Sequence, residues 1–161
     1  MIVLGIDPGT VVTGYGLIKL EDNLVRPIHF GVIRMKSKSH LHTRLKKIYD
    51  ELTKIIQANK PEAVALEGVF YSRNVKTALH IGHARGAAIL AAENYGIHVH
   101  EYSPRQVKQA VTGKGAASKE QVQLMTQRLL HMSDPPTPLD TSDALAIAIC
   151  HLIKTEKCIR F

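Results

Sequence analysis

The sequence predicts an α/β fold in which a five-stranded mixed sheet is flanked by helices. In the first 35 residues, short apolar runs alternate with turn signals, a pattern that is typical of an antiparallel meander. After them, helical periodicities alternate with short apolar runs, which is typical of parallel strands joined by right-handed crossovers. The 161 residues are 45% hydrophobic and 22% charged, which fits a single globular domain over residues 1–161.

The meander consists of three predicted strands, and turn signals separate them. The first run is fully apolar, as expected of a central strand, and Asp7, Pro8 and Gly9 end it. A polar turn at residues 21–23 separates the second run from the third. The predicted strands span residues 2–6, 13–20 and 24–35. Together they form one side of the sheet.

The rest of the chain alternates helices with two further strands, at residues 63–66 and 97–102. Ser103 and Ser118 are predicted N-caps, and Gly96 and Gly113 are predicted helix stops. The predicted helices span residues 39–59 and 74–95, then a short stretch from 104, then 118–131, and a last helix that opens near residue 140.

Charge and composition limit the kinds of partner and compartment. The net charge of +7 and the pI near 9.5 favour a polyanionic partner such as nucleic acid. No apolar run approaches the length of a membrane span, and Met1 leads directly into a strand-like run, so we expect a cytoplasmic protein. Cys150 and Cys158 are predicted to be free thiols in a reducing compartment.

Four acids stand where an apolar run ends or a helix begins: Asp7, Glu67, Asp140 and Asp143. Asp7 and Glu67 end strands that are predicted to be parallel, so they share one sheet edge if those strands are adjacent. Asp140 and Asp143 share one helix face because they are three residues apart. Carboxylates at ~4 Å repel by about 4 kcal/mol per pair, so a cation must hold such a group together. Carboxylate oxygens are the ligands that Mg²⁺ prefers.

Some of these acids also have simpler interpretations. Asp7 could simply start a turn with Pro8 and Gly9 and have no role in metal binding. Asp140 could be the N-cap of the last helix, a role that is compatible with metal binding. Glu67 directly follows a buried run, and a buried charge without a partner is costly.

A second set of residues suits contact with nucleic acid. Phe70 and Tyr71 lie in a predicted loop after Glu67, beside Arg73 and Lys76, and exposed aromatic rings stack on unpaired bases. The alternative is that both rings pack under the loop. A basic segment also follows the fifth strand, where the alternative is a solvated helix face. Its cations are Arg105, Lys108, Lys114 and Lys119.

Four stretches of the sequence resemble the RuvC family of Holliday-junction resolvases. They are "IVLGIDPGTVVTGYG", "ALEGVFYSRNVKTALHIGHARGAAILAA", "EYSPRQVKQAVTGKGAASKEQVQ" and "DTSDALAIAICH". The resemblance implies an RNase H-like fold and a DNA endonuclease that resolves four-way junctions during homologous recombination and DNA repair. This sequence departs from the family at Gly68, where members of the family often have a polar residue.

The resemblance also implies roles for individual residues. The four acids would be catalytic and would hold two Mg²⁺ ions, for which Mn²⁺ can substitute. Phe70 would engage bases at the junction, and Lys108 and Lys119 would serve DNA binding and cleavage. The implied partners are a four-way DNA junction, a second copy of the chain in a homodimer and a branch-migration complex of the RuvA and RuvB type.

Other classes of function stay open at this point. The residues from Asp7 to Thr10 resemble the first phosphate loop of actin-like kinases and ATPases, which need two such domains. An RNase H-like nuclease acting on another nucleic acid and a non-catalytic junction-binding module are further alternatives. For the homodimer, a stripe of small residues on the second helix permits close approach of a partner helix, although it could equally pack on its own sheet. The stripe consists of Gly82, Gly86, Ala87 and Leu90.

Overall fold

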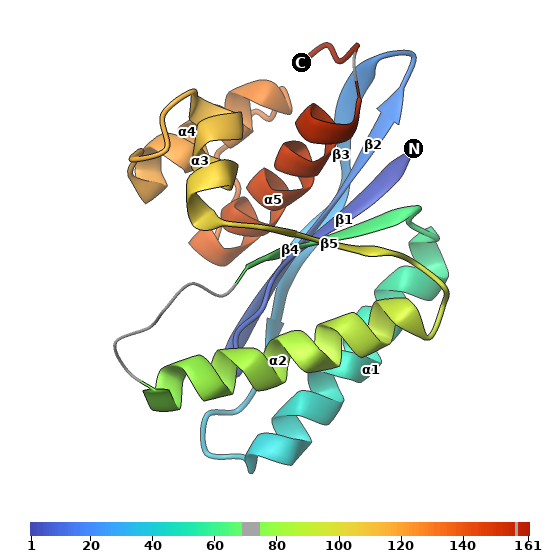
Figure 1. The fold of residues 1–161 in the computed structure, drawn as a ribbon, viewed down its shortest axis with the longest axis vertical. Helices are drawn as coiled ribbons and strands as arrows, with labels where there is room; N and C mark the ends of the chain where they lie inside the picture. Colours follow the sequence, from blue (N-terminus) through green and yellow to red (C-terminus); the bar gives the residue numbers. More distant parts are fainter. Residues whose placement is uncertain (69–74, 157) are drawn as a thin grey trace.

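A computed structural model describes residues 1–68, 75–156 and 158–161. The structure has three layers, with the sheet between α1 and α2 on one face and α3, α4 and α5 on the other (Figure 1). The strands are β1 (Ile2–Asp7), β2 (Val12–Glu21), β3 (Leu24–Arg34), β4 (Ala63–Glu67) and β5 (Val99–Tyr102). The helices are α1 (Leu41–Asn59), α2 (Val75–Glu93), α3 (Pro104–Thr112), α4 (Lys119–Leu129) and α5 (Leu139–Thr155).

The sheet has the predicted mixed topology, with strand order β3-β2-β1-β4-β5. β1, β2 and β3 pair antiparallel, whereas β4 pairs parallel with both β1 and β5. Ile6 of β1 is the register partner of Leu66 of β4. Asp7 and Glu67 therefore end neighbouring strands at the same edge of the sheet, as the sequence predicts.

Side-chain alternation directs both of these acids to the same face. In β1, Leu4 and Ile6 belong to the apolar cluster under α1 and α2, whereas Val3 belongs to the cluster under α5. β4 repeats this alternation in step with β1. Because successive residues of a strand point to opposite faces, Asp7 and Glu67 continue the row that faces α5.

Glycines in the strands let α5 lie directly on the sheet. A Cβ atom on Gly5 would stand 2.0 Å from the backbone oxygen of Ala144, and one on Gly14 would stand 2.0 Å from that of Asp140. Gly14 is also the register partner of Asp7. Close packing at these glycines therefore brings the first turn of α5 to the sheet edge where Asp7 lies.

The predicted N-caps of α3 and α4 and the predicted stop of α3 are confirmed. The hydroxyl of Ser103 accepts a hydrogen bond from the backbone N–H of Gln106, and Ser118 does the same for Gln121. In both cases the glutamine side chain accepts from the N-cap backbone in return, which completes a capping box. Gly113 ends α3 in the left-handed conformation.

The last helix begins near residue 140, as predicted, but Asp140 is not its N-cap. α5 begins at Leu139, and its N-cap is Pro138, whose backbone oxygen accepts from the N–H of Thr141. Asp140 is thus inside the first turn, and the interpretation of Asp140 as the cap is wrong. Its carboxylate still lies at the positive end of the helix dipole, where negative charge is favourable.

Two expectations about the environment can be compared with the structure. Cys150 is buried and Cys158 is exposed, and both are free, as predicted. Within the described ranges, we find no helix with the length and apolar character that crossing a membrane requires.

Candidate active site

The four predicted acids come together where α5 begins. Asp7 arrives on β1, Glu67 arrives on β4, and Asp140 and Asp143 arrive in the first turns of α5. Burial, and after it the charges of Glu67, Asp143 and Asp140 in this order of effect, together raise the pKa of Asp7 from 3.8 to about 7. Mutual repulsion of this kind requires proximity, so the structure gathers the acids as the sequence predicts.

Glu67 shares this electrostatic environment. Burial is the largest cause that raises the pKa of its carboxyl group, and the charge of Asp143 is the next. Lys119, Lys108 and Arg85 act in the opposite direction and lower the pKa. Glu67 is therefore a partly buried acid that lies between other carboxylates and three basic side chains.

Lys119 directly contacts one of the four acids. Its Nζ atom donates a hydrogen bond of 2.9 Å to Oδ2 of Asp143. This hydrogen bond is the main reason why the pKa of Lys119 is raised, and the charges of Asp143, Asp7 and Asp140 add to it. Ser118 fixes the position of Lys119, because it caps the helix that Lys119 begins. Lys119 thus supplies part of the positive charge that the acids require.

The donor set fits a hard divalent cation such as Mg²⁺. Every candidate ligand is a carboxylate, and Mg²⁺ takes oxygen ligands while keeping several waters. Among residues 1–68, 75–156 and 158–161, no three Asp, Glu, His or Cys side chains are arranged so that they could hold one metal ion together. This agrees with carboxylates that repel one another while Lys119 holds Asp143. A cation would offset the repulsion that raises the pKa of Asp7.

Arg85 is a residue near the site that the sequence analysis missed. It lies on α2 and donates from Nη1 to the backbone oxygen of Glu67 over 2.6 Å. Its position among the buried alanines of α2 was a signal, because a cation on an apolar helix face needs a polar partner.

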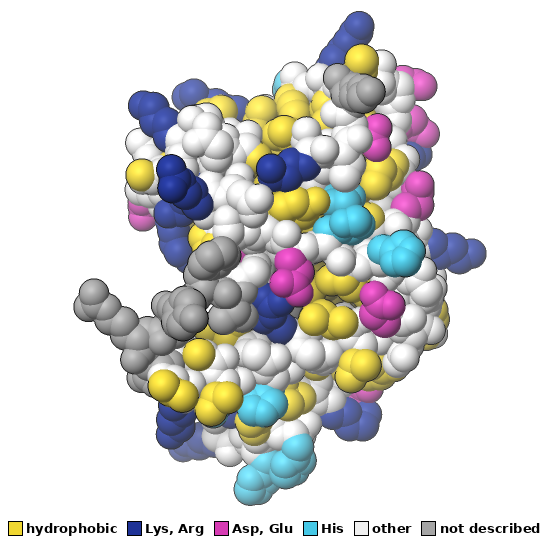
Figure 2. Space-filling view, viewed as in Figure 1, with side chains coloured by type: hydrophobic (Ala, Val, Ile, Leu, Met, Phe, Trp, Pro, Cys, Tyr) yellow, Lys and Arg dark blue, Asp and Glu magenta, His cyan; other side chains and the backbone are white. Residues whose placement is uncertain are grey.

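The basic residues predicted from the sequence lie at different distances from the acids. Lys108 is close enough for its charge to lower the pKa of Glu67, and Lys119 touches Asp143. The side chains of Arg105 and Lys114 are exposed on or just after α3. Lys and Arg side chains are visible over the part of the surface that α3 and α4 form (Figure 2). Lys76 is exposed in the first turn of α2.

Three other candidates for DNA contact lie outside the described residues. They are Phe70, Tyr71 and Arg73. Their proposed roles stay predictions.

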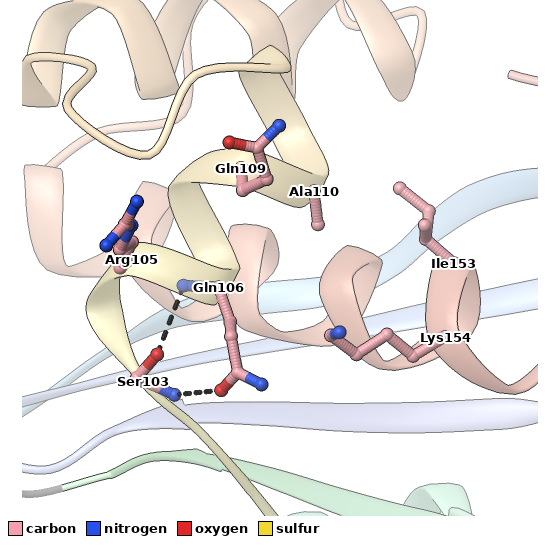
Figure 3. A pocket seen from close by; sticks show the side chains of 7 residues that line it. All are labelled: Ser103, Arg105, Gln106, Gln109, Ala110, Ile153 and Lys154. Atoms are coloured by element: carbon pink, nitrogen blue, oxygen red, sulfur yellow. Dashed lines mark hydrogen bonds between the residues drawn. The ribbon is translucent and has the colours of Figure 1, made fainter.

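A separate pocket of about 550 Å³ lies between α3 and the C-terminal end of α5 (Figure 3). Its lining residues are Ser103, Arg105, Gln106, Gln109, Ala110, Ile153 and Lys154. Lys154 and Asp143 are about 16 Å apart along the helix axis, at a rise of about 1.5 Å per residue. The pocket is thus apart from the acids, and two of its polar side chains are already engaged in the capping box of α3.

α5 contains a buried histidine near its C-terminal end. His151 is 1% exposed, and its Nδ1 atom lies 2.8 Å from the hydroxyl oxygen of Tyr102. Burial, and to a smaller extent the nearby ring of His100, together lower the pKa of His151 from 6.5 to about 4. His151 therefore stays neutral at pH 7 and contributes to packing rather than to the charge of the site.

Comparison with known proteins identifies the family. A family model described as "Crossover junction endodeoxyribonuclease RuvC" matches residues 3–151. The chain belongs to the RuvC family. The RuvC protein of Desulforamulus reducens is 50% identical over 151 residues, covering 94% of this chain and 93% of its own. That of Pelodictyon phaeoclathratiforme is 51% identical over 154 residues, covering 96% of this chain and 81% of its own.

Solved structures agree with this membership of the RuvC family. The structure of Thermus thermophilus RuvC superposes with a TM-score of 0.88 at 36% identity, covering 95% of this chain and 94% of that one. The same protein in complex with a Holliday junction substrate gives 0.90, with 96% of this chain and 94% of that one covered. The predicted RNase H-like fold and the family of junction endonucleases are thus confirmed. Nucleases of the RuvC family are metal-dependent.

Proposed function

We propose that this RuvC-family chain resolves four-way DNA junctions by metal-dependent hydrolysis at the acid site where α5 meets the sheet. The observation that carries the proposal is the gathering of Asp7, Glu67, Asp140 and Asp143 in a chain whose net charge is +7. Binding DNA alone gives no reason to concentrate carboxylates beside a phosphate, because they repel it. Hydrolysis with a metal ion does give one.

In this proposal the four carboxylates hold Mg²⁺, with Mn²⁺ as a substitute. A bound ion would supply an attacking water of lowered pKa and positive charge near the leaving oxygen. The chain's own part is to hold the carboxylates deprotonated and in place. Lys119 serves this purpose because its charge lowers the pKa of both Asp7 and Glu67, and its hydrogen bond orients Asp143.

The DNA-contacting residues in this proposal differ in what they bind. Lys108 and Lys119 are near the acids, where the scissile phosphate would lie, and their charges attract it. Phe70 is proposed to stack on an unpaired base, while Arg73 and Lys76 would contact the backbone. Phosphate contacts add affinity for any DNA, whereas stacking on unpaired bases favours a junction over a duplex.

We further propose that the partner of α2 is a second copy of the chain. Leu79 and Leu90 of α2 are each 58% exposed, although they are large and apolar. Cβ atoms on Gly82 and Gly86 would meet nothing within 4 Å, so these glycines of the predicted stripe do not pack on their own sheet. A four-way junction offers two equivalent phosphates, and a two-fold pair of subunits would present two equivalent sites to them.

Three further expectations about this chain are also proposals. They are a cytoplasmic location, a single nuclease domain over residues 1–161, and cooperation with a branch-migration complex of the RuvA and RuvB type. Each follows from the resemblance to the RuvC family and from the composition of the chain.

Cleavage of different nucleic acids tests the function directly. We expect Mg²⁺-dependent cutting of a synthetic four-way DNA junction, with symmetric nicks in two strands. A DNA duplex of the same sequence is a matched control, since it offers the phosphates without the branch point, and it should be cut far more slowly. Preferential cutting of an RNA–DNA hybrid would show that the chain is a different kind of RNase H-like nuclease. Tight junction binding without cutting in Mg²⁺ or Mn²⁺ would show a binding module.

A further inference from the structure

We propose that Arg85 is a positioning residue that fixes Glu67 for metal binding by holding the backbone beside it. The inference rests on the proposed function, because it assumes that Glu67 is a metal ligand. It adds a residue of α2 to a site whose other members come from the sheet edge, α4 and α5.

The burial of Arg85 indicates that its guanidinium has a specific purpose. The side chain is only 10% exposed, and α2 places it on a face with the fully buried Ala84, Ala88 and Ala92. Removing a guanidinium from water is costly unless hydrogen bonds and an opposite charge compensate. An apolar residue would serve better if the position only had to fill space between helix and sheet.

The hydrogen bonds of Arg85 act on the peptide bond that follows Glu67. Nη1 of Arg85 donates to the backbone oxygen of Glu67 over 2.6 Å. The N–H of the same peptide, which belongs to Gly68, donates to the backbone oxygen of Tyr102 over 2.8 Å. Both polar groups of this peptide are therefore held, one by a side chain and one by the neighbouring strand. The backbone of Glu67 is thereby fixed at the very end of β4.

Glu101 fixes the guanidinium in turn. Nη2 of Arg85 donates to Oε1 of Glu101 over 2.6 Å. Glu101 lies on β5, where it is the register partner of Leu66. The planar guanidinium thus joins the ends of two adjacent strands through two of its nitrogens. Because the Glu101 side chain is 51% exposed, its charge is partly solvated, and its main effect is to set the direction of the guanidinium.

Arg85 reaches the backbone from the face opposite to the acids. α2 covers the face into which Leu66 points, whereas the alternation of β4 directs the Glu67 side chain toward α5. Arg85 can therefore orient Glu67 without occupying the space that a cation needs. Groups that orient a metal ligand without touching the metal typically affect metal affinity or activity by about 10- to 100-fold when they are removed.

The test measures metal binding separately from junction binding. In Arg85→Met, we expect the half-saturating Mg²⁺ concentration for cleavage to rise and kcat to fall by about 10- to 100-fold. Arg85→Lys keeps the charge but has a single donor nitrogen, so it should restore only part of the activity. The rise in melting temperature that Mg²⁺ causes in the unmodified protein should shrink in both variants, and it is read without any substrate. Junction binding without divalent metal should stay within about twofold, because the phosphate contacts are untouched.

Lys46→Met is the matched control. It removes the exposed ion pair between Lys46 and Asp50 on α1. This ion pair does not contact the backbone of the acid site. We expect it to leave the Mg²⁺ dependence unchanged.

The outcomes separate this inference from the proposed function. If Glu67→Gln abolishes cleavage while folded Arg85→Met keeps the unmodified Mg²⁺ dependence and kcat, the positioning role is wrong and the acid site stands. If Glu67→Gln cleaves normally, the acid site itself is wrong. If Arg85→Met does not fold, Glu101→Gln decides, because it weakens only the contact that directs the guanidinium. An unchanged half-saturating Mg²⁺ concentration in Glu101→Gln would then overturn the inference.

Discussion

Glycines in two regions of the molecule have opposite surroundings. At Gly5 and Gly14 in the sheet, the space that a side chain would need is filled by the backbone of α5. At Gly82 and Gly86 on α2, that space is empty. The same residue type therefore marks a completed contact in one region and an uncovered surface in the other.

This difference connects packing to function. α5 is buried almost continuously from Thr141 to Leu152, and its close contact with β1 and β2 brings its first turn to the sheet edge with the acids. α2 packs on α1 and the sheet through its alanines but leaves Leu79 and Leu90 exposed. We infer that the contact at α5 builds the acid site, and that the open stripe on α2 is available to a second copy of the chain.

The largest expected effect on stability comes from substituting a glycine of the sheet that contacts the backbone of α5. Gly14→Ala places a methyl group 2.0 Å from the backbone oxygen of Asp140, so α5 must shift away from the sheet. We expect a loss of unfolding free energy of about 3 kcal/mol or more, together with loss of cleavage, measured by urea denaturation and junction assay. Gly82→Ala is the control, and it should stabilise the monomer by up to about 1 kcal/mol because alanine favours the helix. Equal effects of the two substitutions would contradict the comparison.

The next effect concerns the buried end of α5. The folded pKa of His151 is about 4, below the ordinary value of 6.5. Between these two values the unfolded chain binds a proton that the folded protein does not, so stability falls as the pH decreases from 6.5 toward 4. The loss attributable to His151 should approach about 3 kcal/mol, at 1.36 kcal/mol per unit of pKa difference.

Comparing pH profiles isolates this contribution. Unfolding free energies of the unmodified protein and of His151→Gln are measured across the same pH range. The variant should have a flatter profile below pH 6.5, which is the ordinary pKa of histidine. Parallel profiles would mean that His151 is protonated in the folded protein, and that the environment of α5 is more polar than the structure indicates.

The smallest effect on stability is expected on the open face of α2. Leu79→Glu adds a charge to an exposed side chain, so the unfolding free energy of the monomer should change by no more than about 0.5 kcal/mol. A dimer that buries this face would instead dissociate, because a charge without a partner would be desolvated. Sedimentation of the unmodified protein and of Leu79→Glu at micromolar concentration measures whether each is a dimer. An unmodified protein that is monomeric both alone and on junction DNA would contradict the proposed dimer.

The sequence predicts those parts of this molecule that local chemistry determines. The serine caps at Ser103 and Ser118 and the left-handed stop at Gly113 are signals that lie within a few residues of their effects. The gathering of Asp7 and Glu67 is also predictable, because it needs only strand order and alternation. The alternative of Asp140 as the N-cap of α5 is wrong, because the cap is the backbone of Pro138 rather than a side chain.

The remaining features depend on tertiary contacts between distant residues. The hydrogen bond from Lys119 to Asp143 joins α4 to α5, and the sequence gives only the charges of the two residues. The contact from Arg85 to Glu67 depends on how α2 lies across the sheet. Neither distance can be read from spacing along the chain, because both depend on how whole helices pack.

The central claim is that the acids at the start of α5 carry out the reaction, and Glu67→Gln tests it most directly. The substitution keeps the shape of the side chain but removes a charged oxygen ligand. Under single-turnover conditions in Mg²⁺, cleavage of a four-way junction should fall by at least about 100-fold. Binding of the same junction without divalent metal should be unchanged or tighter, because less negative charge faces the phosphate. Cleavage at the unmodified rate would contradict the account, and loss of both folding and binding would show that Glu67 is structural.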